Sequence, residues 1–141
     1  MAERIFFDTN PVIYYLDAHS LYASKVYWFL VHNKMRGAEF YTSTITNAEF
    51  FCKPMANLDF DKIEAYDRFI QDFRFTVLPI TESIAWRSAQ LRAKYKGLKL
   101  PDALQLAAAM DQHCDSFLTN DERLIQVSEA NVLYLSTLRN D

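Results

Sequence analysis

The sequence predicts an α/β domain with a parallel sheet, because short apolar runs alternate with longer segments of helical periodicity along the chain. The chain has 141 residues, half of them hydrophobic, which is the usual size of one domain with a substantial core. No linker, repeat or low-complexity tract interrupts the pattern. We therefore expect a single domain over residues 1–141, with the element order β-α-α-β-α-α-β-α-α-β-α-β.

The first half of the chain starts with a strand-like run at residues 5–7. Asn10 is a good capping residue for a short helix, with Pro11 at its first position. Ser20 is the predicted N-cap of a longer helix, and Gly37 is its predicted end. A short strand, a helix limited by a proline and a further helix are then expected, at residues 39–41, 46–54 and 59–73.

The second half repeats this alternation. Thr81 is predicted to cap a helix that reaches Gly97, and Pro101 is predicted to open the next one. A short helix is also expected between the last two strands. The three strands of this half are predicted at residues 75–80, 116–118 and 132–135.

Composition argues against several classes of protein. With only 2 glycines, the chain has no glycine-rich loop of the dinucleotide-binding or Walker type. Cys52 and Cys114 form no CxxC pair and the three histidines are scattered, so zinc and disulfide interpretations are weak. The chain also lacks a nucleophile-elbow motif, a signal-peptide core and any apolar run of membrane-spanning length. We expect a cytoplasmic protein.

Four acidic residues stand where strands or capped helices begin or end: Asp8, Glu49, Asp102 and Asp121. In a parallel sheet the loops after the strands gather at the carboxyl edge, so Asp8 and Asp121 are predicted to be neighbours. Carboxylate oxygens without imidazole or thiolate favour hard divalent ions such as Mg²⁺ or Mn²⁺. The pattern therefore indicates a metal-binding carboxylate cluster.

Each acid also has a purely structural explanation. Asp8 and Asp121 are suited to N-caps or Asx turns. Glu49 follows Thr46 at the spacing of a capping box, and Asp102 lies in a first helical turn, where negative charge suits the helix dipole. Taken singly, Asp121, Glu49 and Asp102 are better explained by structure, and only Asp8 is evenly balanced. Taken together, the shared oxygen chemistry and the common position at element ends favour the metal site.

The distribution of charge indicates a basic surface beside this cluster. The net charge is -3, but 14 acids remain against 15 Lys and Arg once the four candidate ligands are set aside. Residues 83–101 contain no Asp or Glu and carry five cations, three of which, Arg92, Lys96 and Lys99, we predict to contact the phosphates of a nucleic acid. A solvated helix face is the alternative.

Aromatic residues are abundant, and six of them fall within the first two predicted helices: Tyr14, Tyr15, Tyr22, Tyr27, Trp28 and Phe29. One helix face cannot hide so many rings. Core packing explains most of them, and we expect the surplus to form a dimer interface or a groove for a partner helix. Base stacking is a third possibility.

Four segments, in order, are similar to the signature blocks of PIN-domain ribonucleases, and in particular of VapC-type toxins of toxin–antitoxin modules: residues 8–16, 46–49, 100–107 and 117–121. The resemblance spans nearly the whole chain, although the segment between Pro54 and Thr81 matches no family motif. It implies a three-layer α/β/α sandwich with a central parallel sheet, a dimer and a cognate antitoxin. It assigns catalytic and metal-binding roles to Asp8, Glu49, Asp102 and Asp121, and supporting hydrogen bonds to Thr9 or Asn10 and to Thr119.

These observations predict a divalent-metal-dependent endoribonuclease, the toxin of a type II toxin–antitoxin system. A metal-activated water held by the carboxylate cluster would hydrolyse the RNA phosphodiester bond, leaving a 5′-phosphate and a 3′-hydroxyl. One alternative is a non-catalytic PIN-like module that binds RNA or protein, whose signature would be the loss of an acid. The other is a metal-dependent DNA nuclease, which would typically need added arches or clamps.

Overall fold

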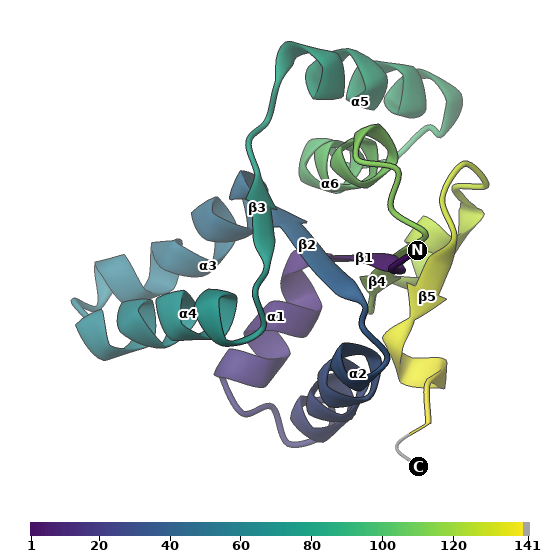
Figure 1. Ribbon diagram of the computed structural model, residues 1–141. Helices are drawn as coiled ribbons and strands as arrows, with labels where there is room; N and C mark the ends of the chain where they lie inside the picture. The colour runs from purple at the N-terminus through teal and green to yellow at the C-terminus, as the bar shows by residue number, and fades with distance from the viewer. Residues whose placement is uncertain (140–141) are drawn as a thin grey trace.

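The computed structural model describes residues 1–139 and shows a five-stranded sheet with helices on both faces (Figure 1). Every pair of neighbouring strands is parallel, and the order across the sheet is β3-β2-β1-β4-β5. The strands are β1 Arg4–Phe7, β2 Glu39–Ser43, β3 Thr76–Leu78, β4 Ser116–Thr119 and β5 Val132–Tyr134. The central position of β1 places the loop after it between the loops after β2 and β4.

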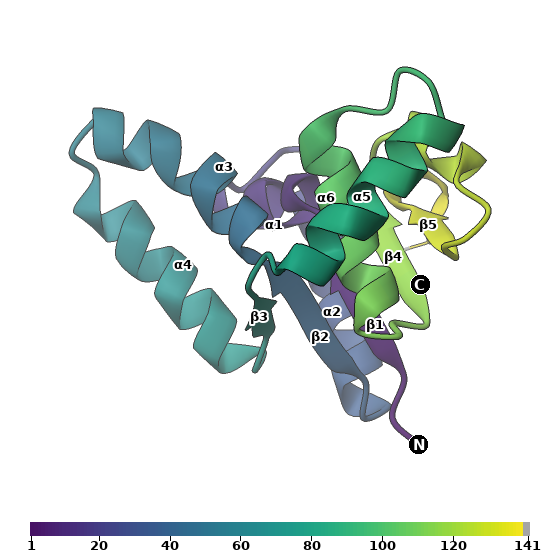
Figure 2. The same cartoon turned by 90° about the horizontal axis from the view of Figure 1, so that it is seen from above.

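The helices form the outer layers of the predicted α/β/α sandwich. They are α1 Thr9–Leu16, α2 Ala23–Met35, α3 Thr44–Ala56, α4 Phe60–Asp72, α5 Glu82–Lys94 and α6 Leu100–Asp111, with 3₁₀ helices η1 Glu122–Gln126 and η2 Leu135–Thr137. Helices α1 and α2 lie on one side of the sheet and α5 and α6 on the other, while α3 and α4 project together from the β3 side (Figures 1 and 2). Within residues 1–139, no helix has the length and apolarity to cross a membrane.

The strand periodicity divides the core between the two faces of the sheet. Ile5 and Phe7 point to one face and Phe6 to the other, as expected for alternating side chains in a strand. Phe6 stacks on Phe117 of the neighbouring β4, with ring centroids 5.4 Å apart. All of these side chains are almost completely buried, so β1 is held in place from both sides and the residue that follows it has a fixed position.

The predicted starts of the first two helices are wrong. Asp8, not Asn10, is the N-cap of α1, and its Oδ1 accepts a hydrogen bond from the backbone N–H of Thr9 at 2.8 Å. Ser20 does not cap α2, because two backbone N–H groups ahead of that helix donate to Nδ1 of His19 instead. The N-cap of α2 is Tyr22, which makes no side-chain capping bond.

Three further boundaries differ from those expected. Pro54 does not end α3 but lies inside its last turn. Strand β3 is shorter than residues 75–80. Helix α5 stops before Gly97, and this glycine has a φ of +87° in the turn that leads to α6. By contrast, Gly37 follows the end of α2 with a φ of +83°, as its position in the sequence indicated.

Candidate active site

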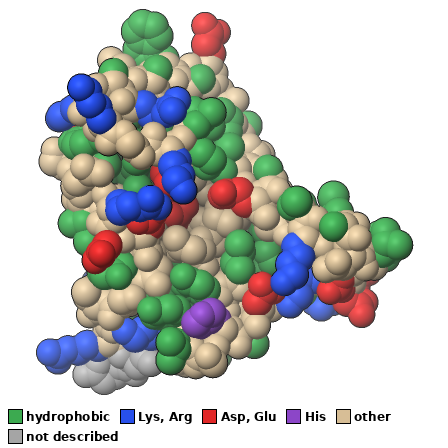
Figure 3. All heavy atoms as spheres, turned by 180° about the vertical axis from the view of Figure 1, so that it is seen from behind, with side chains coloured by type: hydrophobic (Ala, Val, Ile, Leu, Met, Phe, Trp, Pro, Cys, Tyr) green, Lys and Arg blue, Asp and Glu red, His purple; other side chains and the backbone are tan. Residues whose placement is uncertain are grey.

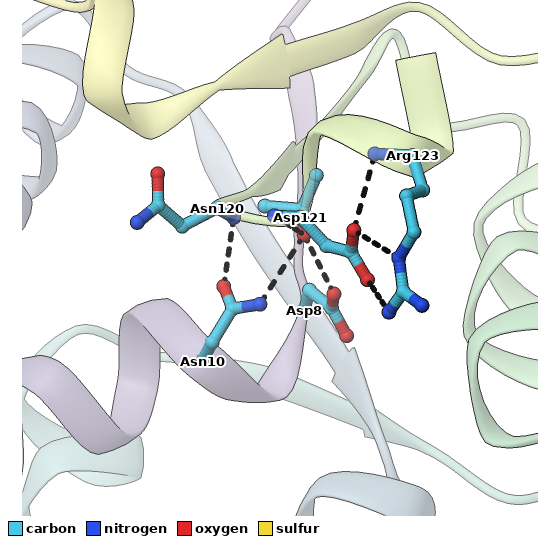
Figure 4. Close-up of polar contacts among 6 residues, drawn as sticks. Asp8, Asn10, Asn120, Asp121 and Arg123 are labelled. Atoms are coloured by element: carbon cyan, nitrogen blue, oxygen red, sulfur yellow. Dashed lines mark hydrogen bonds and ion pairs between the residues drawn. The ribbon is translucent and has the colours of Figure 1, made fainter. Parts of the chain in front are cut away.

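Four different elements place the four acids near one end of the central strands. Asp8 follows β1, Asp121 follows β4, Glu49 lies on α3 and Asp102 lies in the first turn of α6. Strands β1 and β4 are parallel neighbours, so the residues that follow them share the carboxyl edge (Figure 4). The negative charges of Asp102 and Glu49 both raise the pKa of Asp8, so these carboxylates interact through space.

Asp8 is the most buried of the four, with 4% of its surface exposed. Its Oδ1 accepts from the N–H of Thr9, and its Oδ2 accepts from Oγ1 of Thr119 at 2.8 Å. Burial is the largest influence on its pKa, which rises to about 7 although both hydrogen bonds oppose the rise. Asp8 is therefore expected to lose its proton at a higher pH than an ordinary carboxylate.

Asp102 and Glu49 complete the inner part of the site. Burial raises the pKa of Asp102, and repulsion by Asp121 and Glu49 adds to the rise. Glu49 is more exposed, and its Oε1 accepts a 2.7 Å hydrogen bond from Oγ1 of Thr9. Thr9, the first residue of α1, thus fixes one oxygen of Glu49. The other oxygen, Oε2, accepts no hydrogen bond from residues 1–139.

Asp121 has a different environment. It is the N-cap of η1 and accepts from the backbone N–H of Arg123. The Arg123 guanidinium also donates from Nε at 2.9 Å and from Nη2 at 2.7 Å, a two-point contact that is visible in Figure 4. These hydrogen bonds lower the pKa of Asp121, in the opposite direction to Asp8.

The supporting side chains connect the two loops. Thr119 donates to Asp8, and Asn10 donates from Nδ2 to Oγ1 of Thr119 at 3.4 Å. Oδ1 of Asn10 also accepts the backbone N–H of Asn120 at 2.9 Å (Figure 4). Asn10 therefore ties α1 to the loop after β4, whereas Thr9 contacts Glu49.

A buried polar residue behind the carboxylates was missed in the sequence. Gln105 is completely buried on α6, and its Nε2 donates to Oγ1 of Thr46 at 2.8 Å and to Oγ1 of Thr9 at 3.1 Å. Its Oε1 accepts from the hydroxyl of Ser43. The available signal was an amide three residues after Asp102 on an otherwise apolar helix face. This network links α1, α3 and α6 behind the site.

The structural and chemical explanations of the acids are not exclusive. Asp8 and Asp121 both cap helices and also belong to the cluster. The capping-box explanation of Glu49 does not hold, because Ser43 is the N-cap of α3 and Thr46 is hydrogen-bonded to Gln105. Local capping and membership of the cluster therefore have to be judged separately for each residue.

The donor set fits a hard divalent cation in its chemistry. All four candidate ligands are carboxylates, and Asp8 and Asp102 carry mutual repulsion that a cation would relieve. In their present positions, however, no three His, Cys, Asp or Glu side chains among residues 1–139 form a ready ligand group. Asp121 in particular is engaged by Arg123.

Only two of the three cations that were predicted to bind RNA line the same cavity. Lys96 and Lys99 line a small cavity that also includes Asp102 and Arg123. Arg92 instead donates from Nε to the backbone carbonyl of Leu98 at 3.1 Å, so its side chain supports the turn between α5 and α6.

Known proteins provide an independent comparison. The PIN domain family matches residues 5–130. Among curated protein sequences, none matches the chain significantly. A chain of the VapBC2 complex from Rickettsia felis, solved with a DNA fragment from its promoter, aligns over 93% of this chain and 98% of its own length, with 17% identity and a TM-score of 0.78.

Two other solved structures show the same architecture. DNA-bound VapBC from Salmonella typhimurium aligns over 96% of this chain and 99% of its own, with 16% identity and a TM-score of 0.75. FitAcB from Neisseria gonorrhoeae aligns over 95% and 99%, with 20% identity and a TM-score of 0.71. At such identities the likeness establishes the fold. The family match covers most residues of this chain, so the chain belongs to the PIN domain family.

Proposed function

We propose that this protein is a divalent-metal-dependent endoribonuclease and the toxin component of a type II toxin–antitoxin system. The observation that carries the proposal is Asp8, a buried carboxylate at the end of the central strand that is faced by Glu49 and Asp102. Membership of the PIN family and the likeness to chains of VapBC and FitAB complexes support the nuclease and toxin assignments.

Asp8, Glu49, Asp102 and Asp121 are the residues that would hold Mg²⁺ or Mn²⁺. The bound ion would activate a water molecule and offset the negative charge that develops on the phosphate. The protein's own part is to hold the carboxylates: Thr119 and the Thr9 N–H fix the two oxygens of Asp8. Thr9 also holds one oxygen of Glu49, and the second oxygen of that side chain would be free to accept a proton from the attacking water.

The partners follow from the same assignment. We propose a single-stranded RNA substrate, a cognate antitoxin and a second copy of the chain, in a cytoplasmic protein. Most aromatic rings of α1 and α2 pack against the core, which leaves Tyr27, 53% exposed, as the main surplus ring of that group. Further apolar side chains are exposed around the turn between α3 and α4: Met55, Leu58 and Phe60. Exposed groups of this kind usually mark protein partners.

The test compares Asp8→Asn with a matched capping control. Asp59 is the N-cap of α4 and accepts the N–H of Lys62, so Asp59→Asn alters a cap outside the candidate site. We expect the wild type and Asp59→Asn to cut single-stranded RNA with Mg²⁺ or Mn²⁺, and Asp8→Asn to be inactive with an unchanged circular dichroism spectrum. DNA of the same sequence should stay intact. Undiminished RNA cleavage in excess EDTA, or full activity of Asp8→Asn, contradicts the proposal.

A further inference from the structure

A small basic cavity lies directly beside the acidic cluster. It has a volume of about 210 Å³, and its lining includes Asp102 and the cations Lys96, Lys99 and Arg123. Figure 3 shows the corresponding contrast on the back of the molecule, where Lys and Arg side chains gather next to a recessed group of acidic ones. Positive charge is therefore concentrated at one border of the candidate active site.

Two of these cations have no partner in the described part of the chain. Lys96 and Lys99 are exposed, and neither ammonium group forms a hydrogen bond or ion pair with any of the residues 1–139. Lys94, from the same acid-free segment, behaves differently because its Nζ pairs with Glu129 at 3.1 Å. Lys96 and Lys99, at the end of the segment nearest Asp102, are therefore available to a ligand.

The third cation is only partly engaged. Arg123 uses its Nε and Nη2 to hold Asp121. A guanidinium has five N–H donors in a planar fork, and Nη1 of Arg123 has no partner in the described part of the chain. Arg123 can therefore hold Asp121 through Nε and Nη2 and donate hydrogen bonds to an anion from Nη1.

The turn between α5 and α6 gives the cavity a defined shape. Gly97 adopts a φ of +87° there, a conformation that costs other residues strain. Leu98 is buried, and its carbonyl accepts from Arg92 at 3.1 Å. Lys99 then occupies the N-cap of α6 without a side-chain capping bond, so the positive end of that helix dipole adds to the charge of the lysines.

We propose that this cavity is a phosphate-binding subsite for single-stranded RNA, which holds a backbone phosphate next to the one that is cleaved. The identification of the strand as RNA rests on the proposed function. A phosphate group presents several acceptor oxygens and can engage two ammonium groups and a guanidinium at the same time. Because the cavity borders Asp102, a phosphate bound in it would set the register of the strand relative to the carboxylates.

The test measures RNA binding without cleavage, in the full-length protein with the Asp8→Asn change and with Mg²⁺ present. The variants are Lys96→Ala/Lys99→Ala, Arg123→Ala and the control Lys94→Ala, and the probe is a fluorescein-labelled single-stranded RNA titrated at several KCl concentrations. Losing one phosphate contact should flatten the slope of log affinity against log salt by about 0.7. We expect this change, with about threefold to tenfold weaker binding to every RNA sequence, in the first two variants only.

The binding result is separable from the cleavage result. If the wild type does not cut RNA but the double lysine variant still lowers affinity and salt slope, the subsite stands and the enzyme assignment falls. If affinity and slope match those of Lys94→Ala, the subsite is wrong, whether or not the wild type is active. It is equally wrong if the lysine changes weaken only the binding of a coexpressed antitoxin, because the cavity would then serve an acidic peptide.

Discussion

The inner and outer halves of the candidate site hold their carboxylates by different means. In the inner half, Asp8 and Glu49 are fixed by neutral hydrogen bonds from Thr9 and Thr119, in front of the buried Gln105 network. In the outer half, Asp121 is held by a two-point ion pair with a largely exposed arginine. Both Asp8 and Asp121 follow neighbouring parallel strands and cap the helix that comes next.

The difference shows that local structure does not determine the chemistry of a carboxylate. Burial among other acids raises the pKa of Asp8 to about 7, whereas Arg123 lowers the pKa of Asp121. At Asp8 the two neutral hydrogen bonds do not offset lost hydration and like-charge repulsion, whereas at Asp121 the nearby guanidinium does. A bound cation would relieve the repulsion in the inner half, whereas the outer half already contains the Arg123 guanidinium.

The largest effect is expected on the rate of RNA cleavage, when the inner half loses the charge of Asp8. Asp8→Asn should lower the rate of RNA cleavage by about a thousandfold, because it removes charge from the least solvated position of the cluster. Its metal-free melting temperature should be unchanged or raised, since the amide relieves repulsion without loss of the cap. Single-turnover cleavage and thermal melting with and without Mg²⁺ measure both. A clear fall in metal-free stability would show that the acid is mainly structural.

The hydrogen-bond network is the next target. Gln105→Leu should lower the free energy of unfolding by about 2–3 kcal/mol, because buried hydroxyls such as that of Ser43 lose their partner. The exposed Gln90 of α5 provides the control, and Gln90→Leu should change it by less than about 0.5 kcal/mol. Urea unfolding followed by circular dichroism gives both values. Equal stability of the two variants would contradict a network that fixes the inner half.

The pH dependence of metal-free stability tests the charge state of Asp8. Its pKa is raised from 3.8 to about 7, so between these values the folded state holds a proton that the unfolded state has released. Stability should therefore fall as the pH rises from about 5 to 7, by about 2 kcal/mol, and level off above about 7. Urea titrations at several pH values should show this slope in the wild type and in Asp59→Asn. The slope should be largely absent in Asp8→Asn, and its persistence there would assign it to other groups.

The smallest effect is expected in the outer half. Asp121→Asn should lower the cleavage rate by about tenfold, far less than Asp8→Asn, because Arg123 already offsets much of the Asp121 charge. The two variants are to be compared at the same Mg²⁺ concentration in one kinetic series. Equal losses of cleavage rate in both variants would show that the Asp121–Arg123 pair opens when metal and RNA bind. The difference in environment between Asp8 and Asp121 would then not apply to the active enzyme.

Much of the architecture was accessible from local patterns. Alternating apolar runs and helical periodicity predicted the element order, and the four sequence blocks predicted the PIN fold that the strand order and the family match confirm. The roles of the four acids remain a prediction, although the structure places them within electrostatic reach of one another. Errors arose at two helix starts: Asp8 rather than Asn10 caps α1, and α2 begins after Tyr22 without a side-chain cap from Ser20.

The sequence by itself determined which residues carry carboxylate groups and which segment combines several cations with no acid, because residue type and spacing are local properties. Only the tertiary structure decided that burial raises the pKa of Asp8 while Asp121 is paired with Arg123, and that Gln105 connects three helices behind them. It also decided that Lys96 and Lys99 are unpaired whereas Lys94 and Arg92 are engaged. The burial of a side chain and its ion pairs depend on residues that are remote in the chain, so they cannot be predicted from local spacing.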